Sequence, residues 1–156
     1  MYILYASQNG NAETVAKSIH DRLDIKNKDL MSLNDSIDLF KNKHFDRNFF
    51  IVVSTTGNGE IPISGDLWWR YIKNRNLDKS CCIDCKFHIL AIGDSNYNHF
   101  CASGKKIYRR LVELGAQLMT QIIYIDDSID DYDEKIFESM IPFLTLNPLL
   151  QNYHVD

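Results

Sequence analysis

The sequence predicts an α/β fold in which a doubly wound parallel sheet is covered by helices on both faces. Two observations lead to this prediction. Short apolar runs alternate along the chain with segments whose apolar residues recur at helical spacing. The run Phe49–Val53 is apolar at every position, as expected of a strand buried on both faces of a parallel sheet. Right-handed crossovers between such strands place helices on the faces of the sheet.

The elements are expected in the following order and places. Strands are predicted at Tyr2–Ala6, Asp29–Leu33, Phe49–Val53, Lys86–Ile92 and Gln121–Ile125. Helices are predicted at Ala12–Leu23, Ile63–Leu77, Cys101–Leu114 and Asp133–Leu144. The first helix carries apolar residues at i, i+3, i+4 and i+7, and Gly115 is a typical residue to end the third one. Pro142 interrupts the last helix late, and the polar, poorly periodic stretch Asn34–Asn48 is left without an assignment.

Length and composition restrict the class of protein. The chain has 156 residues, of which 45% are apolar, and this suits a single globular domain spanning residues 1–156. Its net charge of −4 gives no electrostatic basis for nucleic-acid binding. No run reaches the roughly 20 apolar residues of a membrane span, and the N-terminus has no basic segment followed by an apolar one. A cytoplasmic location is therefore expected.

The four cysteines do not form a recognisable metal or redox motif. They are Cys81, Cys82, Cys85 and Cys101. The Cys82-x-x-Cys85 pair has no second pair at zinc spacing, and it does not begin a helix as thioredoxin-type chemistry requires. Free thiols in a loop before a strand are the simplest interpretation, and no metal site is expected.

Three polar loops follow the first, third and fourth predicted strands. They are Ser7–Ala12, Ser54–Glu60 and Gly93–Cys101, and all are rich in Gly, Ser, Thr and Asn. In a doubly wound sheet, ligands bind beyond the carboxyl ends of the strands, at the point where strand order reverses. These loops are therefore expected to meet around one ligand.

The first loop has the features of a phosphate site. It joins a strand to a helix, where free backbone N–H groups and the helix dipole attract an anion. It contains neither Lys nor Arg, and the Gly-Lys-Ser/Thr and Gly-x-Gly-x-x-Gly motifs are absent, so a single phosphate held by neutral donors fits better than a triphosphate or a dinucleotide. The alternative is a polar turn in which Asn9 or Asn11 caps the helix.

The other two loops offer places for a flat ring. Gly57 and Gly59 in the second loop admit positive φ angles and allow the backbone to approach a planar ligand closely. Tyr97 in the third loop can stack on an aromatic ring, although a tyrosine in a loop can equally pack on the protein itself.

Together these loops resemble the three FMN-binding loops of the flavodoxin-like family. The resemblance rests on Ser7-Gln8-Asn9-Gly10-Asn11-Ala12-Glu13, Ser54-Thr55-Thr56-Gly57-Asn58-Gly59 and Gly93-Asp94-Ser95-Asn96-Tyr97 with His99-Phe100-Cys101. Within this family, the chain resembles the FMN modules of diflavin reductases and short free-standing flavodoxins. It implies a five-stranded parallel sheet in the order 2-1-3-4-5 and FMN as the cofactor.

The resemblance also implies which residues bind the cofactor. Those implied are Ser7, Gln8, Asn9, Gly10, Asn11 and Ala12 around the phosphate, Ser54, Thr55, Thr56, Gly57, Asn58 and Gly59 beside the ring, Ile92, Gly93, Asp94, Ser95, Asn96, Tyr97, Asn98, His99, Phe100 and Cys101 on its other side, and Asp127 near the ribityl chain. Tyr97 is expected to stack on the ring, and a carbonyl at the flexible Gly57 to turn toward it.

Two residues depart from the family pattern. Asn9 stands where the family usually has Thr, although an amide can donate a hydrogen bond in place of the hydroxyl. Thr56 stands where P450 reductase-like modules carry an aromatic residue. One face of the ring is therefore left to Trp68, to Trp69 or to nothing.

The implied function is one-electron transfer between a flavin reductase of the FAD/NADPH type and a redox acceptor, either as a free carrier or as a module of a larger NADPH-dependent oxidoreductase. A cluster of acidic residues suits docking to a basic partner, or simply a solvated loop and helix start: Asp126, Asp127, Asp130, Asp131, Asp133 and Glu134.

The alternative to an electron carrier is a regulatory protein that kept the fold without the flavin. A phosphoacceptor domain would need acids where Ala6, Ser7 and Ser54 stand, and nothing provides the nicotinamide site of a quinone reductase.

Overall fold

A single parallel sheet forms the centre of the molecule. The computed structural model describes residues 1–42 and 47–144. Six strands make up the sheet: β1 (Tyr2–Ala6), β2 (Asp29–Ser32), β3 (Asn48–Ser54), β4 (Lys86–Gly93), β5 (Gln117–Leu118) and β6 (Ile123–Asp126). Their order is β2-β1-β3-β4-β5, with β6 also paired to β4. The predicted order 2-1-3-4-5 is confirmed, with two short strands sharing the fifth place.

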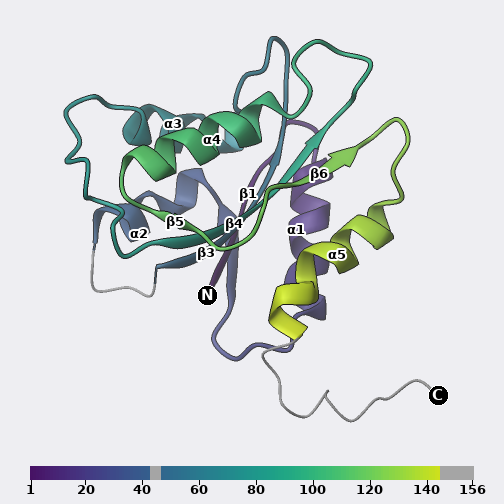
Figure 1. Cartoon of the computed structure of the whole chain (residues 1–156), viewed down its shortest axis with the longest axis horizontal. Helices are drawn as coiled ribbons and strands as arrows, with labels where there is room; N and C mark the ends of the chain where they lie inside the picture. The colour runs from purple at the N-terminus through teal and green to yellow at the C-terminus, as the bar shows by residue number, and fades with distance from the viewer. Residues whose placement is uncertain (43–46, 145–156) are drawn as a thin grey trace.

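Helices cover both faces of this sheet (Figure 1). They are α1 (Asn11–Arg22), α2 (Ile37–Lys41), α3 (Asp66–Ile72), α4 (Ala102–Glu113) and α5 (Tyr132–Leu144), with 3-10 turns η1 (Asn34–Ser36) and η2 (Ile63–Gly65). On one face, α1 and α5 bury residues such as Val15 and Met140. On the other, α2, α3 and α4 bury Phe40, Trp68 and Leu111. The predicted α/β class is confirmed.

The last strand differs from its predicted form. Gln121–Ile125 was expected to be one strand, but pairing with β4 resumes only at Ile123, after the separate short strand β5. Between these strands, β4 advances from Phe87 to Leu90 while the edge advances from Leu118 to Ile123. The edge chain carries extra residues over this interval, so it leaves the ladder and rejoins it.

The helix predicted at Ile63–Leu77 is shorter and begins as a 3-10 turn. Its α-helical part starts at Asp66, and the Oδ1 atom of Asn34 accepts hydrogen bonds there from the N–H groups of Leu67 and Trp68 at 2.9 and 3.1 Å. The helix ends at Ile72, where the Nε–H of Arg110 donates a hydrogen bond to the Ile72 carbonyl at 2.7 Å. Part of the unassigned stretch Asn34–Asn48 forms η1 and α2, while residues 43–46 lie outside the described chain.

The four cysteines are free thiols; three are buried in the core, and Cys81 is half-buried beside it. Cys82 and Cys85 are buried in the turn before β4, and Cys101 is buried at the start of α4. Burial, reinforced by the neighbouring Cys82, raises the pKa of Cys81 to about 11, so this thiol stays protonated at neutral pH. In residues 1–42 and 47–144, no cluster of His, Cys, Asp and Glu is arranged to hold a metal ion. Within the same residues, no helix combines the length and apolar character that crossing a membrane requires.

Candidate functional site

The loops that follow the strands meet at the carboxyl edge of the sheet and enclose a cavity. The loops after β3, β4 and β6 project from the same end of the sheet (Figure 1). The cavity has a volume of about 850 Å³, within the range of small-molecule sites. The residues that line it are Gln8, Asn9, Gly10, Asn11, Thr14, Ser54, Thr55, Thr56, Gly57, Ile92, Gly93, Asp94, Tyr97, His99 and Asp127.

Most of the predicted site residues line this cavity, and all three predicted loops contribute. The remaining predicted residues belong to the same loops or their flanks but do not line it: Ser7, Ala12, Asn58, Gly59, Ser95, Asn96, Asn98, Phe100 and Cys101. Thr14 lines the cavity and was not predicted. It lies one helical turn after Gly10, and its hydroxyl donates to the Gly10 carbonyl at 2.9 Å. The spacing of four residues between Gly10 and Thr14 could have indicated from the sequence that Thr14 lies at the site.

Most backbone N–H groups of the first loop have no partner within the described part of the chain. Gly10 has a φ of 90°, and α1 begins at the next residue with no side-chain cap. The alternative in which Asn9 or Asn11 caps the helix is therefore wrong. Among the described residues, none accepts a hydrogen bond from the backbone N–H of residues 8–12. The buried hydroxyl of Ser7 also has no partner among them. The loop thus presents several free donors at the positive end of a helix.

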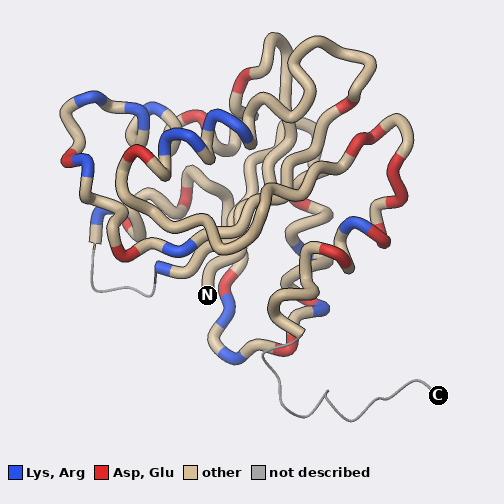
Figure 2. Tube along the Cα trace, in the orientation of Figure 1, with Lys and Arg blue, Asp and Glu red and all other residues tan. Residues whose placement is uncertain are grey.

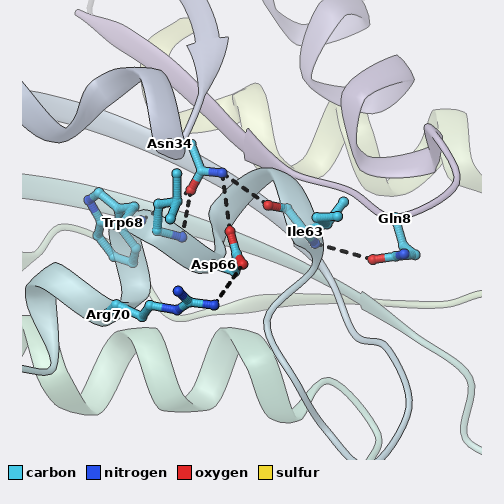
Figure 3. A network of polar contacts seen from close by, with 7 residues as sticks. Gln8, Asn34, Ile63, Asp66, Trp68 and Arg70 are labelled. Atoms are coloured by element: carbon cyan, nitrogen blue, oxygen red, sulfur yellow. Dashed lines mark hydrogen bonds and ion pairs between the residues drawn. The ribbon is translucent and has the colours of Figure 1, made fainter.

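The first loop is held by η2, which Asn34 links to the start of α3 (Figure 3). The amide oxygen of Gln8 accepts a hydrogen bond from the Ile63 N–H at 3.1 Å. The Ile63 carbonyl accepts in turn from the Asn34 amide at 2.9 Å. The hydroxyl of Ser64 accepts from the Ser7 N–H at 2.7 Å and donates to the Ser7 carbonyl at 3.0 Å. These bonds fix the loop without using the N–H groups that face the cavity.

The second loop is a tight turn with two glycines in the left-handed region, as their position suggested. The φ angles of Gly57 and Gly59 are 48° and 86°. Thr56 and Glu60 close the turn, with their N–H groups donating to each other's carbonyls at 3.2 and 2.8 Å. Gly57 is exposed and lines the cavity, while Gly59 is buried. The turn therefore has a packed side and an open side.

The third loop is joined to the loop after β6 through Asp126. The Oδ1 atom of Asp126 accepts from the Ser128 hydroxyl at 2.7 Å and from the Ser95 N–H at 3.1 Å. These bonds, that from the Ser128 side chain most strongly, lower the pKa of Asp126 to about 2. Next to it, the N–H of Asp127 donates to the Gly93 carbonyl at 2.7 Å. Asp126 is therefore a structural acid.

A tyrosine joins the first loop to the last. The hydroxyl of Tyr132 donates to Asp127 Oδ1 at 2.6 Å and accepts from the Asn11 amide at 2.8 Å. Burial, together with the carboxylate of Asp127, raises the pKa of Tyr132 above its usual range, so the hydroxyl keeps its proton. Sequence reasoning missed Tyr132, because its partner in the first loop, Asn11, is distant along the chain.

Neither tryptophan reaches the cavity. Trp68 has no exposed surface, and its ring packs edge-on against Phe40 with centroids 5.3 Å apart. Trp69 packs against the same core. Of the possibilities left open for one face of the ring, both tryptophans are excluded, because α3 turns both side chains into the protein. The aromatic side chains at the cavity are those of Tyr97, which is 72% exposed, and His99.

Charge is unevenly distributed around the site. The lining contains Asp94 and Asp127 but neither Lys nor Arg. Acidic residues gather in the loop after β6 and at the start of α5, whereas basic residues gather on α4 and in the loop after α3 (Figure 2). Part of the acidic cluster is structural, since Asp130 accepts from the Asp126 N–H at 2.8 Å and Asp133 pairs with Arg22 at 2.7 Å. The exposed members are Asp127, Asp131, Asp133 and Glu134.

Comparisons with known proteins agree with this geometry. The sequence pattern of the flavodoxin family matches residues 3–139. Methionine synthase reductase of Bos taurus is 34% identical over 129 residues, which cover 81% of this chain and 18% of the relative. The sulfite reductase [NADPH] flavoprotein alpha-component of Bacillus subtilis is 34% identical over 138 residues, covering 87% of this chain and 22% of the relative. The chain thus spans about a fifth of the length of these relatives.

A solved flavodoxin matches over its full length. The crystal structure of oxidised flavodoxin 2 from Bacillus cereus superimposes with a TM-score of 0.69 and 25% identity. The match covers 94% of this chain and 98% of that one. The arrangement of strands and helices described above is therefore that of a complete flavodoxin fold.

Proposed function

The chain belongs to the flavodoxin family, and we propose that it binds one FMN in the cavity at the carboxyl edge and carries single electrons between two redox partners. The observation that carries this proposal is the meeting of three polar loops around one cavity, with free N–H groups at the start of α1. The chain would act as one unit, either alone or as a module of an NADPH-dependent oxidoreductase like the two larger relatives.

The first loop fits the phosphate of FMN. Its free backbone N–H groups are donors that a phosphate would satisfy. Asn9 lines the cavity, and its amide has no hydrogen-bond partner among the described residues, so it can donate where the family usually has a hydroxyl. The Gln8 amide oxygen is already bonded to Ile63, so that oxygen supports the loop from behind.

The second and third loops fit the ring and the ribityl chain. Tyr97 is exposed at the cavity and would stack on one face of the ring. Gly57 would lie at the ring edge, where the absence of a side chain allows close approach. Asp127 would accept hydrogen bonds from ribityl hydroxyls through Oδ2, because Tyr132 already holds its Oδ1.

The chain's own residues would tune the chemistry of the cofactor. Bound FMN supplies one-electron redox chemistry, for which the protein provides orientation and electrostatics. Asp94 and Asp127 line the site, no lysine or arginine does, and the whole chain has a charge of −4. Added negative charge on the ring is therefore unfavourable, and a low potential for the second electron follows.

Partners of two kinds fit this role. The larger relatives bear the names of reductases, so a flavin reductase of the FAD/NADPH type is the proposed donor and a redox protein the acceptor. The exposed acids Asp131 and Glu134 follow the cavity-lining Asp127 closely along the chain and suit a basic docking surface. Reduction rates should then fall as ionic strength rises, and a flat salt profile would count against docking by charge.

Flavin titration tests the proposal directly. Quenching of flavin fluorescence is measured as the protein is added to FMN, FAD or riboflavin. We expect tight binding of FMN and affinity for riboflavin weaker by about 100-fold or more, because the phosphate loses charge-assisted hydrogen bonds. Equal affinity for FMN and riboflavin would contradict the phosphate site. Failure to bind any flavin would favour the alternative of a flavin-free regulatory protein.

A charge substitution locates the phosphate. Asn9→Asp places a carboxylate at the first loop, and we expect it to weaken FMN binding about tenfold or more while leaving riboflavin binding nearly unchanged. Asn58→Asp is the matched control. It adds the same charge at an exposed residue that does not line the cavity. Equal effects of the two substitutions would place the phosphate elsewhere.

A further inference from the structure

Helix α4 holds the second loop from outside the cavity. The ammonium group of Lys106 donates to the Gly59 carbonyl at 2.6 Å. The hydroxyl of Ser103, which has no exposed surface, donates to the Glu60 carbonyl at 2.7 Å. Ser103 and Lys106 lie three residues apart and so share one face of the helix. Two consecutive carbonyls of the turn are therefore bonded to α4.

The packing of Gly59 makes this attachment close. A Cβ atom at Gly59 would lie 3.0 Å from Ala102 Cβ and 3.3 Å from His99 Cβ. The backbone of the turn thus rests directly against the start of α4. This side of the loop has no room to move inward, and the Lys106 bond opposes movement outward.

The remaining carbonyls of the turn differ in whether they accept a hydrogen bond. The Thr56 carbonyl accepts from the N–H groups of Gly59 and Glu60 at 3.0 and 2.8 Å. Within the described part of the chain, no group donates to the carbonyls of Gly57 or Asn58. Of these two residues only Gly57 lines the cavity. The Gly57 carbonyl is therefore the acceptor of the turn that a ligand in the cavity can still engage.

We propose that Lys106 is a positioning residue that sets the redox potentials of bound FMN by holding the Gly59 carbonyl against α4. The inference rests on the proposed function. With Gly59 and Glu60 fixed, only the Gly57 peptide can reorient, and its carbonyl can accept a hydrogen bond from the ring N–H that flavin gains on reduction. If Lys106 is lost, the base of the turn loosens, and this bond forms less often.

Substitution of Lys106 tests the inference with two measurements. K106M removes the donor and the charge, whereas K106R keeps both. We expect K106M to speed hydrogen exchange at the Gly59 and Glu60 amides of the flavin-free protein about tenfold. In the FMN-bound protein we expect the one-electron potentials to change their separation by about 59 mV, the equivalent of a tenfold change in relative affinity. K106R should restore both values.

A matched control is Lys73→Met, which removes the same charge at an exposed lysine outside the cavity. It should leave exchange and potentials unchanged. If K106M binds FMN with wild-type potentials, the inference is overturned while the proposed function stands. K106M could instead shift the potentials while amide exchange stays at the wild-type rate. The charge of Lys106, and not its hydrogen bond to Gly59, would then influence the potentials, and the positioning role would be wrong. If the wild type binds no FMN, the proposed function fails, and the exchange data alone still decide whether Lys106 holds the turn.

Discussion

The first and second loops lie at the same edge of the sheet but are held in opposite ways. In the first loop, η2 binds the Ser7 backbone through Ser64 and the Gln8 side chain through Ile63, and the N–H groups of residues 8–12 stay free. In the second, α4 binds the carbonyls of Gly59 and Glu60 and leaves that of Gly57 free. One loop thus offers donors suited to an anion, and the other offers an acceptor suited to a ring N–H. Which backbone groups the scaffold occupies decides which remain for a ligand.

The largest expected difference between the loops concerns their glycines. Gly59→Ala combines a positive φ with contacts at 3.0 Å to Ala102, and we expect it to lower the free energy of unfolding by about 3 kcal/mol. Gly10→Ala has a similar φ but nothing within 4 Å of the new Cβ, so we expect a loss of about 1 kcal/mol. Urea unfolding measures both. Equal losses would show that the second loop is not packed more tightly than the first.

The support of the first loop is tested next, through Asn34. Asn34→Ala removes the acceptor for the N–H groups of Leu67 and Trp68 and the donor to Ile63, so we expect a loss of about 2 kcal/mol in unfolding free energy. FMN affinity should fall as well, because Ile63 orients Gln8.

The matched control for Asn34 is Asn58→Ala at the exposed tip of the second loop. We expect it to change the unfolding free energy by less than about 0.5 kcal/mol, as surface substitutions usually do. Unfolding in urea and FMN titration measure these effects. If Asn34→Ala weakens neither stability nor binding, the network in Figure 3 does not support the first loop.

The smallest expected effect depends on pH and concerns the third loop. The pKa of Asp126 is about 2 in the folded protein, below its ordinary value of 3.8, so its carboxylate stabilises the fold above about pH 4. That contribution is lost as the pH falls through about 2. Asp126→Asn should therefore be less stable than wild type at pH 7, and the difference should shrink to a small fraction of that value at pH 2. Urea midpoints at both pH values test this, and a difference that persists in full at pH 2 would exclude the ionised carboxylate as its source.

Much of the candidate site could be predicted because its signals are local. Asn9, Gly57, Tyr97 and Asp94 follow apolar strands directly, and the carboxyl ends of parallel strands share one edge of the sheet. Trp68 shows where this reasoning fails. The sequence left open whether Trp68 covers one face of the ring, because the direction in which α3 faces depends on packing against Phe40, and local spacing does not record that.

The sequence alone determined the α/β class, the strand order through the family resemblance, and the three loops that line the cavity. Periodicity, apolar runs and turn residues are local properties, and they suffice to place each loop. Only the tertiary structure decided which backbone groups in those loops are free. The residues that occupy the others, among them Ser64, Ser103 and Lys106, come from distant elements, and their hydrogen bonds arise only when the helices pack on the sheet.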